Sequence, residues 1–256
     1  MNLKFTTCER RGPVLVVTID RPDARNALNV EAHHELGRIF DDFEDDPSLR
    51  VAIITGAGNK AFCAGSDIKD DVDPDRKPVS GFAGLSRRFD LRKPVIAAVN
   101  GFALGGGVEI LLSCDIAVAV ESARFGFPEP RVGLAAIEGG LQRLAQHIPF
   151  KFAMQMLLTC ETIDAATALR FGLVNEVVHE SALLETAMRY ASAVVAGAPL
   201  AIEATKAVVM QGMAEAGVTG ASVWRHQVVT QLWESSDAIE GISAFTQRRQ
   251  PVWKGK

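Results

Sequence analysis

Short apolar runs alternate with amphipathic stretches in the first half of the chain, and this alternation predicts its elements. Four continuous runs are rich in β-branched residues: "VLVVTI" at 14–19, "VAIIT" at 51–55, "VIAAV" at 95–99 and "IAVAV" at 116–120. Such short, wholly apolar runs are typical of buried strands. Residues 29–46 place apolar side chains near helical spacing, which predicts a helix between the first two strands. Strands that alternate with helices favour an α/β fold with a mostly parallel sheet.

The second half of the chain has helical signals almost throughout. From Pro149 onward they are interrupted by "GLVNEVV" at 172–178, a predicted strand, and residues from about 198 to 247 predict successive amphipathic helices. Asn29 is expected to cap the helix of residues 29–46. Asp164 is expected to cap a short helix that ends at Gly172, and Ser181 to cap the one after it.

Length, charge and cysteine content narrow the class of protein. The chain has 256 residues, enough for one large domain or one domain with an extension. Its net charge of −4 argues against a nucleic acid as the main partner. The four cysteines are widely spaced, which predicts reduced thiols rather than a zinc site or a disulfide framework. We see neither a secretory signal nor a membrane span, so the expected location is the cytoplasm.

Three stretches carry candidate chemistry. In "VNGFALGGGVEILLSCD" at 99–115, glycines follow a predicted strand and open a predicted helix, so free amides point at whatever lies there. Glu109 falls in the first turn of that helix and leans toward the same spot. "KAFCAGSDIK" at 60–69 follows "VAIITGAGN", again a predicted strand and a glycine-bearing turn, and its small residues Ala64, Gly65 and Ser66 would expose backbone amides. In "RFGFPEPRVGL" at 124–134, two prolines fix the backbone around Glu129. Each stretch also has an ordinary structural explanation, as helix packing, a simple turn or a capping glutamate.

Taken together and in this order, these stretches resemble the enoyl-CoA hydratase/isomerase (crotonase) family. The resemblance begins at "IDRPDARNALN" (19–29) and reaches "GLVNEVV", nearly the whole chain. It implies a crotonase-like superhelix of ββα turns over residues 1–195. It also implies a C-terminal helical region, 196–256, that serves oligomerisation and covers the site. Trimers that pair into hexamers and acyl-CoA substrates of fatty acid metabolism are implied as well. Coenzyme A is then part of the substrate, and no metal or separate cofactor is expected.

The resemblance also assigns roles to matching positions. Ser66 and Gly106 match the backbone amides of an oxyanion hole for the thioester carbonyl. Glu109 and Glu129 match the two catalytic glutamates of the hydratases. The positions that match CoA-binding backbone are Arg25, Ala27, Ala64, Ser66, Asp67, Ile68 and Lys69.

The implied reaction is physically reasonable. Adding water to an α,β-unsaturated thioester builds negative charge on the carbonyl oxygen, and two fixed N–H donors stabilise that charge. Neighbouring carboxylates resist double ionisation, so one of them stays protonated near neutral pH. We assign Glu109 to activate water and Glu129 to protonate the α-carbon, with the roles reversed in dehydration.

Two features depart from the hydratase pattern. "LAAIEGG" at 134–140 puts Ala136 and Ile137 where a glycine-rich run is usual and adds a third carboxylate, Glu138. Ile137 would narrow the site, and Glu138 would act as a capping residue or another acid. The polar segment 70–81, which lies where the family lines its acyl pocket, favours a short or polar acyl group. It is either a surface loop or a cover for the site. Double-bond isomerisation of an enoyl-CoA and dehydration of a short or polar acyl-CoA stay open as alternatives.

A different class, an NAD(P)-dependent oxidoreductase, is disfavoured. "TGAGNKA" at 55–61 mimics a dinucleotide fingerprint, but the charged, proline-broken residues 70–78 stand where a second strand with its acidic end is needed. The single tyrosine, Tyr190, is followed by Val194 rather than a lysine. A thiol nucleophile at Cys63 is also disfavoured, because no histidine shows a partner pattern. His33 and His34 are expected on a helix surface.

Overall fold

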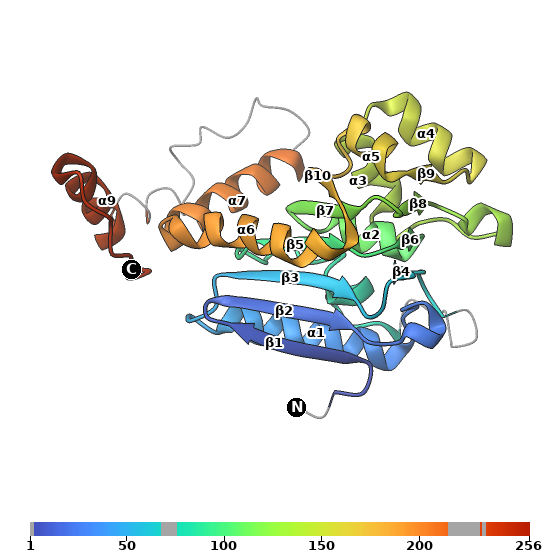
Figure 1. Ribbon diagram of the computed structural model, residues 1–256, viewed down its shortest axis with the longest axis horizontal. Coiled ribbons are helices and arrows are strands. Elements are labelled where there is room, and N and C mark those ends of the chain that lie inside the picture. The colour runs from blue at the N-terminus through green and yellow to red at the C-terminus, as the bar shows by residue number, and fades with distance from the viewer. Residues whose placement is uncertain (1–2, 68–75, 215–230, 232–233) are drawn as a thin grey trace.

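The computed structural model describes residues 3–67, 76–214, 231 and 234–256. Within them a six-stranded sheet has the order β1-β2-β3-β5-β7-β10 (Figure 1). β1 pairs with β2 antiparallel, and every other neighbouring pair of this sheet is parallel. The mixed α/β class with a mostly parallel sheet is therefore confirmed. The strands are β1 (Thr6–Arg11), β2 (Val14–Ile19), β3 (Val51–Gly56), β5 (Val95–Val99), β7 (Ile116–Val120) and β10 (Glu176–Val178).

A second sheet of four short strands completes the repeating turns. Its order is β4-β6-β8-β9, from β4 (Ala61–Cys63), β6 (Phe102–Leu104), β8 (Arg124–Gly126) and β9 (Ile163–Asp164). β3, β5 and β7 of the large sheet are each followed by a strand of the small sheet, and helix α2 (Gly106–Leu112) follows the β5-β6 pair. This succession is the superhelix of ββα turns that the resemblance implies.

Most of the other described elements are α-helices, and short 3₁₀ segments lie between some of the elements. The helices are α1 (Val30–Asp45), α3 (Gly140–His147), α4 (Phe150–Thr159), α5 (Ala165–Phe171), α6 (Leu183–Ala196), α7 (Pro199–Ala214) and α9 (Ser236–Gln247). The 3₁₀ segments are η1 (Pro22–Ala24), η3 (Phe82–Gly84), η4 (Glu129–Val132) and η5 (Glu180–Ala182). α6 packs across β3, β5 and β7, and α1 packs against η3 and β1.

Two of the three predicted helix caps are confirmed. The side chain of Asn29 accepts the Ala32 N–H at the start of α1, and that of Asp164 accepts the Thr167 N–H at the start of α5, which ends at Gly172. The prediction for Ser181 is wrong. Ser181 lies inside η5, and the His179 side chain accepts its N–H instead. A one-turn 3₁₀ segment before α6 thus takes the place of a direct cap.

Two further expectations need correction. The strand predicted over 172–178 shortens to β10, because Gly172 takes a left-handed φ of 82° as it ends α5. His34 is exposed as expected, but His33 is buried on the inner face of α1. Its Nδ1 accepts the Ala83 N–H, and its ring meets the Phe82 ring edge-on.

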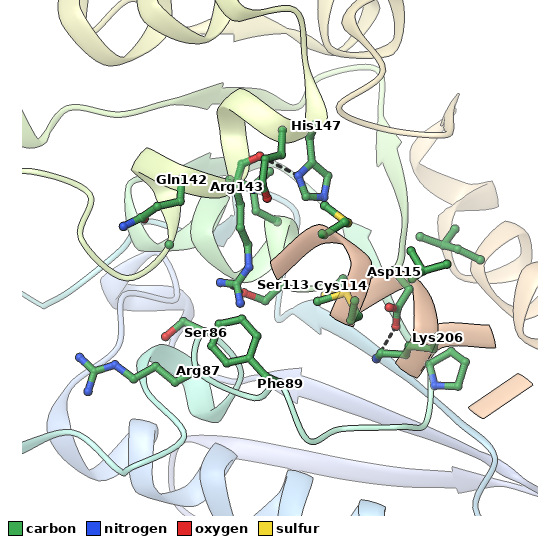
Figure 2. Close-up of a pocket in the computed structure, with 18 of the residues that line it drawn as sticks. Ser86, Arg87, Phe89, Ser113, Cys114, Asp115, Gln142, Arg143, His147 and Lys206 are labelled. Carbon is green, nitrogen blue, oxygen red and sulfur yellow. Dashed lines mark hydrogen bonds and ion pairs between the residues drawn. The ribbon is translucent and has the colours of Figure 1, made fainter. Parts of the chain in front are cut away.

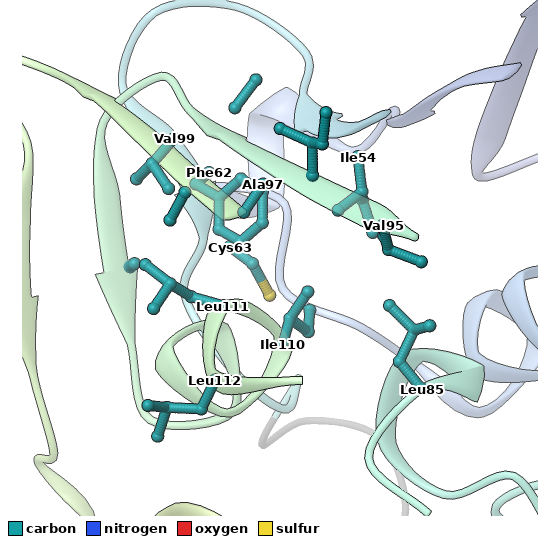
Figure 3. Packing of buried hydrophobic residues seen from close by; sticks show 14 of the residues in the cluster. Ile54, Phe62, Cys63, Leu85, Val95, Ala97, Val99, Ile110, Leu111 and Leu112 are labelled. Carbon is teal, nitrogen blue, oxygen red and sulfur yellow. The ribbon is translucent and has the colours of Figure 1, made fainter. Parts of the chain in front are cut away.

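The hydrophobic core lies between the two sheets and the helices that cover them. α2 contributes Ile110, Leu111 and Leu112 to this core, packed near β4 and β5 (Figure 3). Cys63 is wholly buried in the same cluster, and burial raises the pKa of its thiol to about 12. A thiol with such a pKa stays protonated at neutral pH and is a poor nucleophile, which agrees with its expected packing role.

The C-terminal region, residues 196–256, contacts the body of the chain through α7, where the Lys206 Nζ donates to the Lys93 carbonyl and pairs with Asp115. The Trp253 Nε1 donates to the Ala196 carbonyl at 2.8 Å, and Asp237 accepts the N–H groups of Lys254 and Gly255. The division into residues 1–195 and 196–256 stays a prediction. Among the described residues no single helix is long and apolar enough to cross a membrane. One bent pair, Glu180–Ala196 with Pro199–Met213, meets those criteria jointly.

Candidate active site

The turn between β6 and α2 is built so that only glycine fits. Gly105 has a φ of 53° and a ψ of −120°, which L side chains rarely adopt. A Cβ on Gly106 would lie 2.2 Å from the Phe82 Cζ, so a side chain there would collide with the ring. Gly106 is the first residue of α2, a position whose N–H has no carbonyl partner within the helix. The predicted oxyanion donor, the Gly106 N–H, is thus the first amide of α2, and the Phe82 ring packs against the same residue.

Ser66 lies on the neighbouring segment. The Gly65 carbonyl accepts the Leu28 N–H, and the Asp67 N–H donates to the Leu28 carbonyl. Because amides alternate in direction along an extended chain, the Ser66 N–H between them points away from Leu28. The Cβ position of Gly65 lies 3.4 Å from the Gly106 nitrogen, so the segments of Ser66 and Gly106 are in contact.

Glu109 is buried in the first turn of α2, with 3% of the residue exposed. Its Oε1 accepts the Gly140 N–H at 3.0 Å. Burial raises the pKa of the Glu109 carboxyl to about 7, and the charges of Glu129 and Glu138 add to the rise while the Gly140 N–H opposes it. The group therefore changes charge near neutral pH, the range in which a general base is most useful.

Glu129 approaches the same turn from η4, where Pro128 and Pro130 flank it. A Cβ on Gly105 would lie 2.6 Å from its Oε1, which places this carboxylate against the start of α2. Its Oε2 is buried and has no hydrogen-bond partner among the described residues. Burial raises the pKa of the Glu129 carboxyl. The two predicted catalytic glutamates thus flank one glycine turn, and both are biased toward the protonated form.

The third carboxylate of this region, Glu138, has other partners. Its Oε2 accepts the Ser86 Oγ–H at 2.8 Å, and its Oε1 pairs with the Arg87 Nη2 at 3.0 Å. It does not cap α3, whose N-cap is Gly139 with no side-chain cap bond. Ile137 is 62% exposed and lines the cavity described below, so the expectation that it narrows the site stays a prediction.

The predicted CoA-binding segments lie side by side. The Ala64 N–H donates to the Arg25 carbonyl at 3.1 Å. Arg21, which sequence reasoning missed, joins the same segments: its guanidinium donates to the Ala27 carbonyl and forms an ion pair with Asp67 at 2.9 Å. The arginines of the stretch "DRPDAR" are the feature of the sequence from which this contact could have been predicted. The predicted residues Ile68 and Lys69, and residues 70–75 of the polar segment, lie outside the described residues.

A cavity of about 700 Å³ lies beside the glutamates and was not predicted. Figure 2 shows Arg143 reaching from α3 toward Ser113 at the end of α2, with Phe89 near it. Gly139 lines the cavity, one residue before the glycine whose N–H binds Glu109. The cavity thus begins close to the carboxylate pair, although neither Glu109 nor Glu129 lines it. Within the described residues, no group of three or more His, Cys, Asp or Glu side chains is placed to hold a metal ion.

Comparison with known proteins identifies the family of this chain. A family model described as enoyl-CoA hydratase/isomerase matches residues 9–256. The carnitinyl-CoA dehydratase of Citrobacter koseri is 44% identical over 263 residues, covering 100% of this chain and 99% of that protein. The carnitinyl-CoA dehydratase of Proteus mirabilis is 42% identical over 262 residues, with the same coverage.

The chain belongs to the enoyl-CoA hydratase/isomerase family. It is an enzyme of the hydro-lyase and isomerase type, as the sequence predicts. Solved structures of this family share its fold. An enoyl-CoA hydratase from Mycobacterium tuberculosis superposes with a TM-score of 0.91 at 36% identity, over 98% of this chain and 99% of that one. One from Bacillus anthracis gives 0.90 at 31% identity, over 99% and 100%. The predicted family and crotonase fold are confirmed, whereas the roles of the individual residues stay predictions.

Proposed function

We propose that the enzyme adds water reversibly to a 2-enoyl-CoA thioester, using Glu109 and Glu129 as its acid–base pair. The observation that carries this proposal is the meeting of both carboxylates at the Gly105–Gly106 turn, each with a raised pKa. A site with one carboxylate could move a proton from one carbon of the acyl chain to another, which is isomerisation. Two carboxylates can hold a water molecule and deliver a second proton, which hydration requires.

The thioester carbonyl binds at the N–H groups of Ser66 and Gly106. Negative charge develops on this oxygen as the enolate forms, and donors fixed by the backbone stabilise it without reorganising. The contact between the Ser66 and Gly106 segments and the unused helix-terminal amide support this role. Removing one such donor typically costs about 10²–10³-fold in rate.

The proton transfers divide between the two carboxylates. Glu109 in its charged form takes a proton from water, which attacks the β-carbon, and protonated Glu129 gives a proton to the α-carbon. The unpartnered Oε2 of Glu129 supports a donor role, because its hydrogen-bonding capacity is left for a ligand. In dehydration the β-hydroxyl leaves as water and each carboxylate reverses its role.

The adjacent segments at Arg25–Ala27 and Ala64–Asp67 hold the CoA portion of the substrate, with Ile68 and Lys69 continuing the second segment. CoA enters as part of the substrate, and this mechanism uses no separate cofactor or metal. The acyl group extends toward the cavity of about 700 Å³, which has room for a short or polar chain. Since the relatives named above are carnitinyl-CoA dehydratases, carnitinyl-CoA and its dehydration product are the first substrate pair to test.

The enzyme is proposed to work as a homotrimer or a hexamer in the cytoplasm. Phe150 and Leu158 on α4 leave apolar surface exposed away from that cavity, which supports a subunit contact there. All four cysteines are free thiols, as a reducing compartment allows. We also propose that the C-terminal region or the 70–81 segment covers the site.

A substrate panel in heavy-oxygen water tests the proposed reaction. The wild-type enzyme is offered 2-enoyl-CoA and 3-hydroxyacyl-CoA thioesters of graded length and polarity, including the carnitinyl pair. We expect the enoyl thioester absorbance to fall and heavy oxygen to appear at the β-carbon. An enzyme that only isomerises would move the double bond without incorporating oxygen. That outcome, or no reaction with any member of the panel, contradicts the proposal.

A further inference from the structure

Glu138 is a buried carboxylate that the proposed chemistry does not use. Only 3% of its side chain is exposed, and its side-chain partners among the described residues come from one segment distant in sequence. Besides the bonds to Ser86 and Arg87, its Oε1 lies 3.6 Å from the Lys77 Nζ. Both oxygens of this carboxylate are already engaged, Oε2 by a hydroxyl and Oε1 by two cations, so Glu138 is assigned no part as a third catalytic acid although it lines the cavity.

One end of this cluster is tied to Glu109. Glu138 stands two residues before Gly140, whose N–H binds the Glu109 Oε1 at 3.0 Å. A shift of the Glu138 backbone would therefore move the donor that orients this carboxylate. Glu138 also acts through its charge, which favours the protonated form of Glu109 and contributes to its raised pKa.

The other side of the cluster contacts the segment of Phe82, whose ring packs against Gly106. The Ser86 Oγ accepts the Phe82 N–H at 2.7 Å while donating its proton to Glu138. The Phe82 ring lies where a Cβ of Gly106 would be, and Lys77 sits 5.7 Å from the centre of that ring. The path from Glu138 through Ser86 to Phe82 thus reaches the proposed oxyanion amide.

We infer that Glu138 is a positioning residue that braces two walls of the site against each other. It holds the loop that orients Glu109 to the segment that carries Phe82, so both walls keep one relative position during turnover. This inference rests on the proposed function for its kinetic consequences. The brace itself is a property of the folded protein and can be measured without turnover.

Two variants separate the two effects of the brace. Glu138→Gln keeps the size of the side chain but removes its charge, while Ser86→Ala keeps the charge and breaks the link to Phe82. Because small misplacements of catalytic groups are costly, we expect each variant to lower kcat by about 10- to 100-fold. The exposed Glu185→Gln on α6 is the matched control and should behave as wild type.

Carboxyl NMR with labelled glutamate gives the readout that needs no substrate. Glu129, Glu138 and Arg143 are the charged groups that act on Glu109. Removing the negative charge of Glu138 should lower the pKa of Glu109, which is assigned by loss of its signal in Glu109→Gln. Ser86→Ala should leave that pKa nearly unchanged while kcat still falls. Thermal unfolding checks that each variant is folded.

The outcomes are distinct. A folded Glu138→Gln protein with the wild-type Glu109 titration overturns the inference whatever its kcat, as does a folded Ser86→Ala protein with the wild-type kcat. If the wild-type enzyme hydrates no acyl-CoA, the proposed function fails. The NMR titration then still decides the brace, because an unshifted Glu109 in Glu138→Gln overturns it.

Discussion

At the scale of single residues, the two glutamates differ in how their oxygens are satisfied. Glu109 has a fixed backbone donor at Gly140, whereas Glu129 keeps a buried oxygen without a partner among the described residues. Such an oxygen carries a cost in the folded protein, since a buried polar atom loses its bonds to water. Costs of this kind are typical of sites where a ligand completes the hydrogen bonding.

Glu109 should therefore make stability depend on pH. Its folded pKa of about 7 lies above the ordinary value of 4.5, so the folded state loses stability as pH rises from about 4.5 to 7. Glu109→Gln removes a charge that is costly to bury and should stabilise the protein by about 3 kcal/mol above that range. Thermal unfolding at pH 5 and pH 8 measures this. A variant with the wild-type Tm at both pH values contradicts the assigned pKa.

Gly106 supports a second prediction at this scale. In Gly106→Ala the new methyl group would meet the Phe82 ring, which is packed against His33 and cannot move freely. We expect a loss of turnover of about 10²-fold, the cost of misplacing catalytic groups by about 1 Å. Gly212→Ala is the matched control, because nothing lies within 4 Å of its Cβ position in α7. Equal kcat in the two variants would count against an oxyanion role for this turn.

At the scale of elements, continuous apolar runs were enough to predict the long buried strands, but not β1, whose six residues are mostly polar and mostly exposed. The runs at 14–19, 95–99 and 116–120 match β2, β5 and β7 to the residue. The short strands β4, β6 and β8 were missed, because three residues are too few to show a period. Their backbone bonds depend on neighbours from the preceding turn of the superhelix, which local sequence does not reveal.

Local sequence also reveals only part of the candidate site. Motif residues such as Ser66, Gly106 and the glutamates could be predicted because each lies in a recognisable stretch. The partners of Glu138 could not, since Ser86 and Arg87 lie 52 and 51 residues away. The cavity was also missed because α3, α7 and the segment around Phe89 form it together.

The start of α1 allows a test at the element scale. Asn29→Ala removes the acceptor for the Ala32 N–H and should lower the free energy of unfolding by about 1 kcal/mol. Ser181→Ala, at the position wrongly predicted as a cap, should cost less. Chemical denaturation of both variants decides between them. An Asn29→Ala protein as stable as Ser181→Ala would show that the cap contributes nothing measurable.

At the scale of the whole molecule, the fold brings one turn of the superhelix after another to a single site. The proposed oxyanion amides come from the segments after β4 and β6, and the proposed catalytic residue Glu129 follows β8. In this proposal the short second sheet aligns the catalytic groups, while the long first sheet supplies the core behind them. Activity should depend on the superhelix as a unit rather than on any single loop.

The proposed assembly is tested at the same scale. Light scattering after size-exclusion chromatography should give three or six times the mass of the 27.5 kDa chain. Replacing the exposed Phe150 and Leu158 of α4 with charged residues should shift this mass toward the monomer, because burying a charge in an apolar contact is costly. A wild-type protein that elutes as a monomer at all concentrations contradicts the assembly.

The central claim is that Glu109 and Glu129 act together on one water molecule. The most direct measurement is kcat for hydration of the best substrate by Glu109→Gln, Glu129→Gln and the double variant, with Glu185→Gln as control. Each single variant should be slower by about 10²–10⁴-fold. Since the groups work as a unit, the double variant should be far less impaired than the product of the two losses. Single variants that both hydrate at the wild-type rate would contradict the claim.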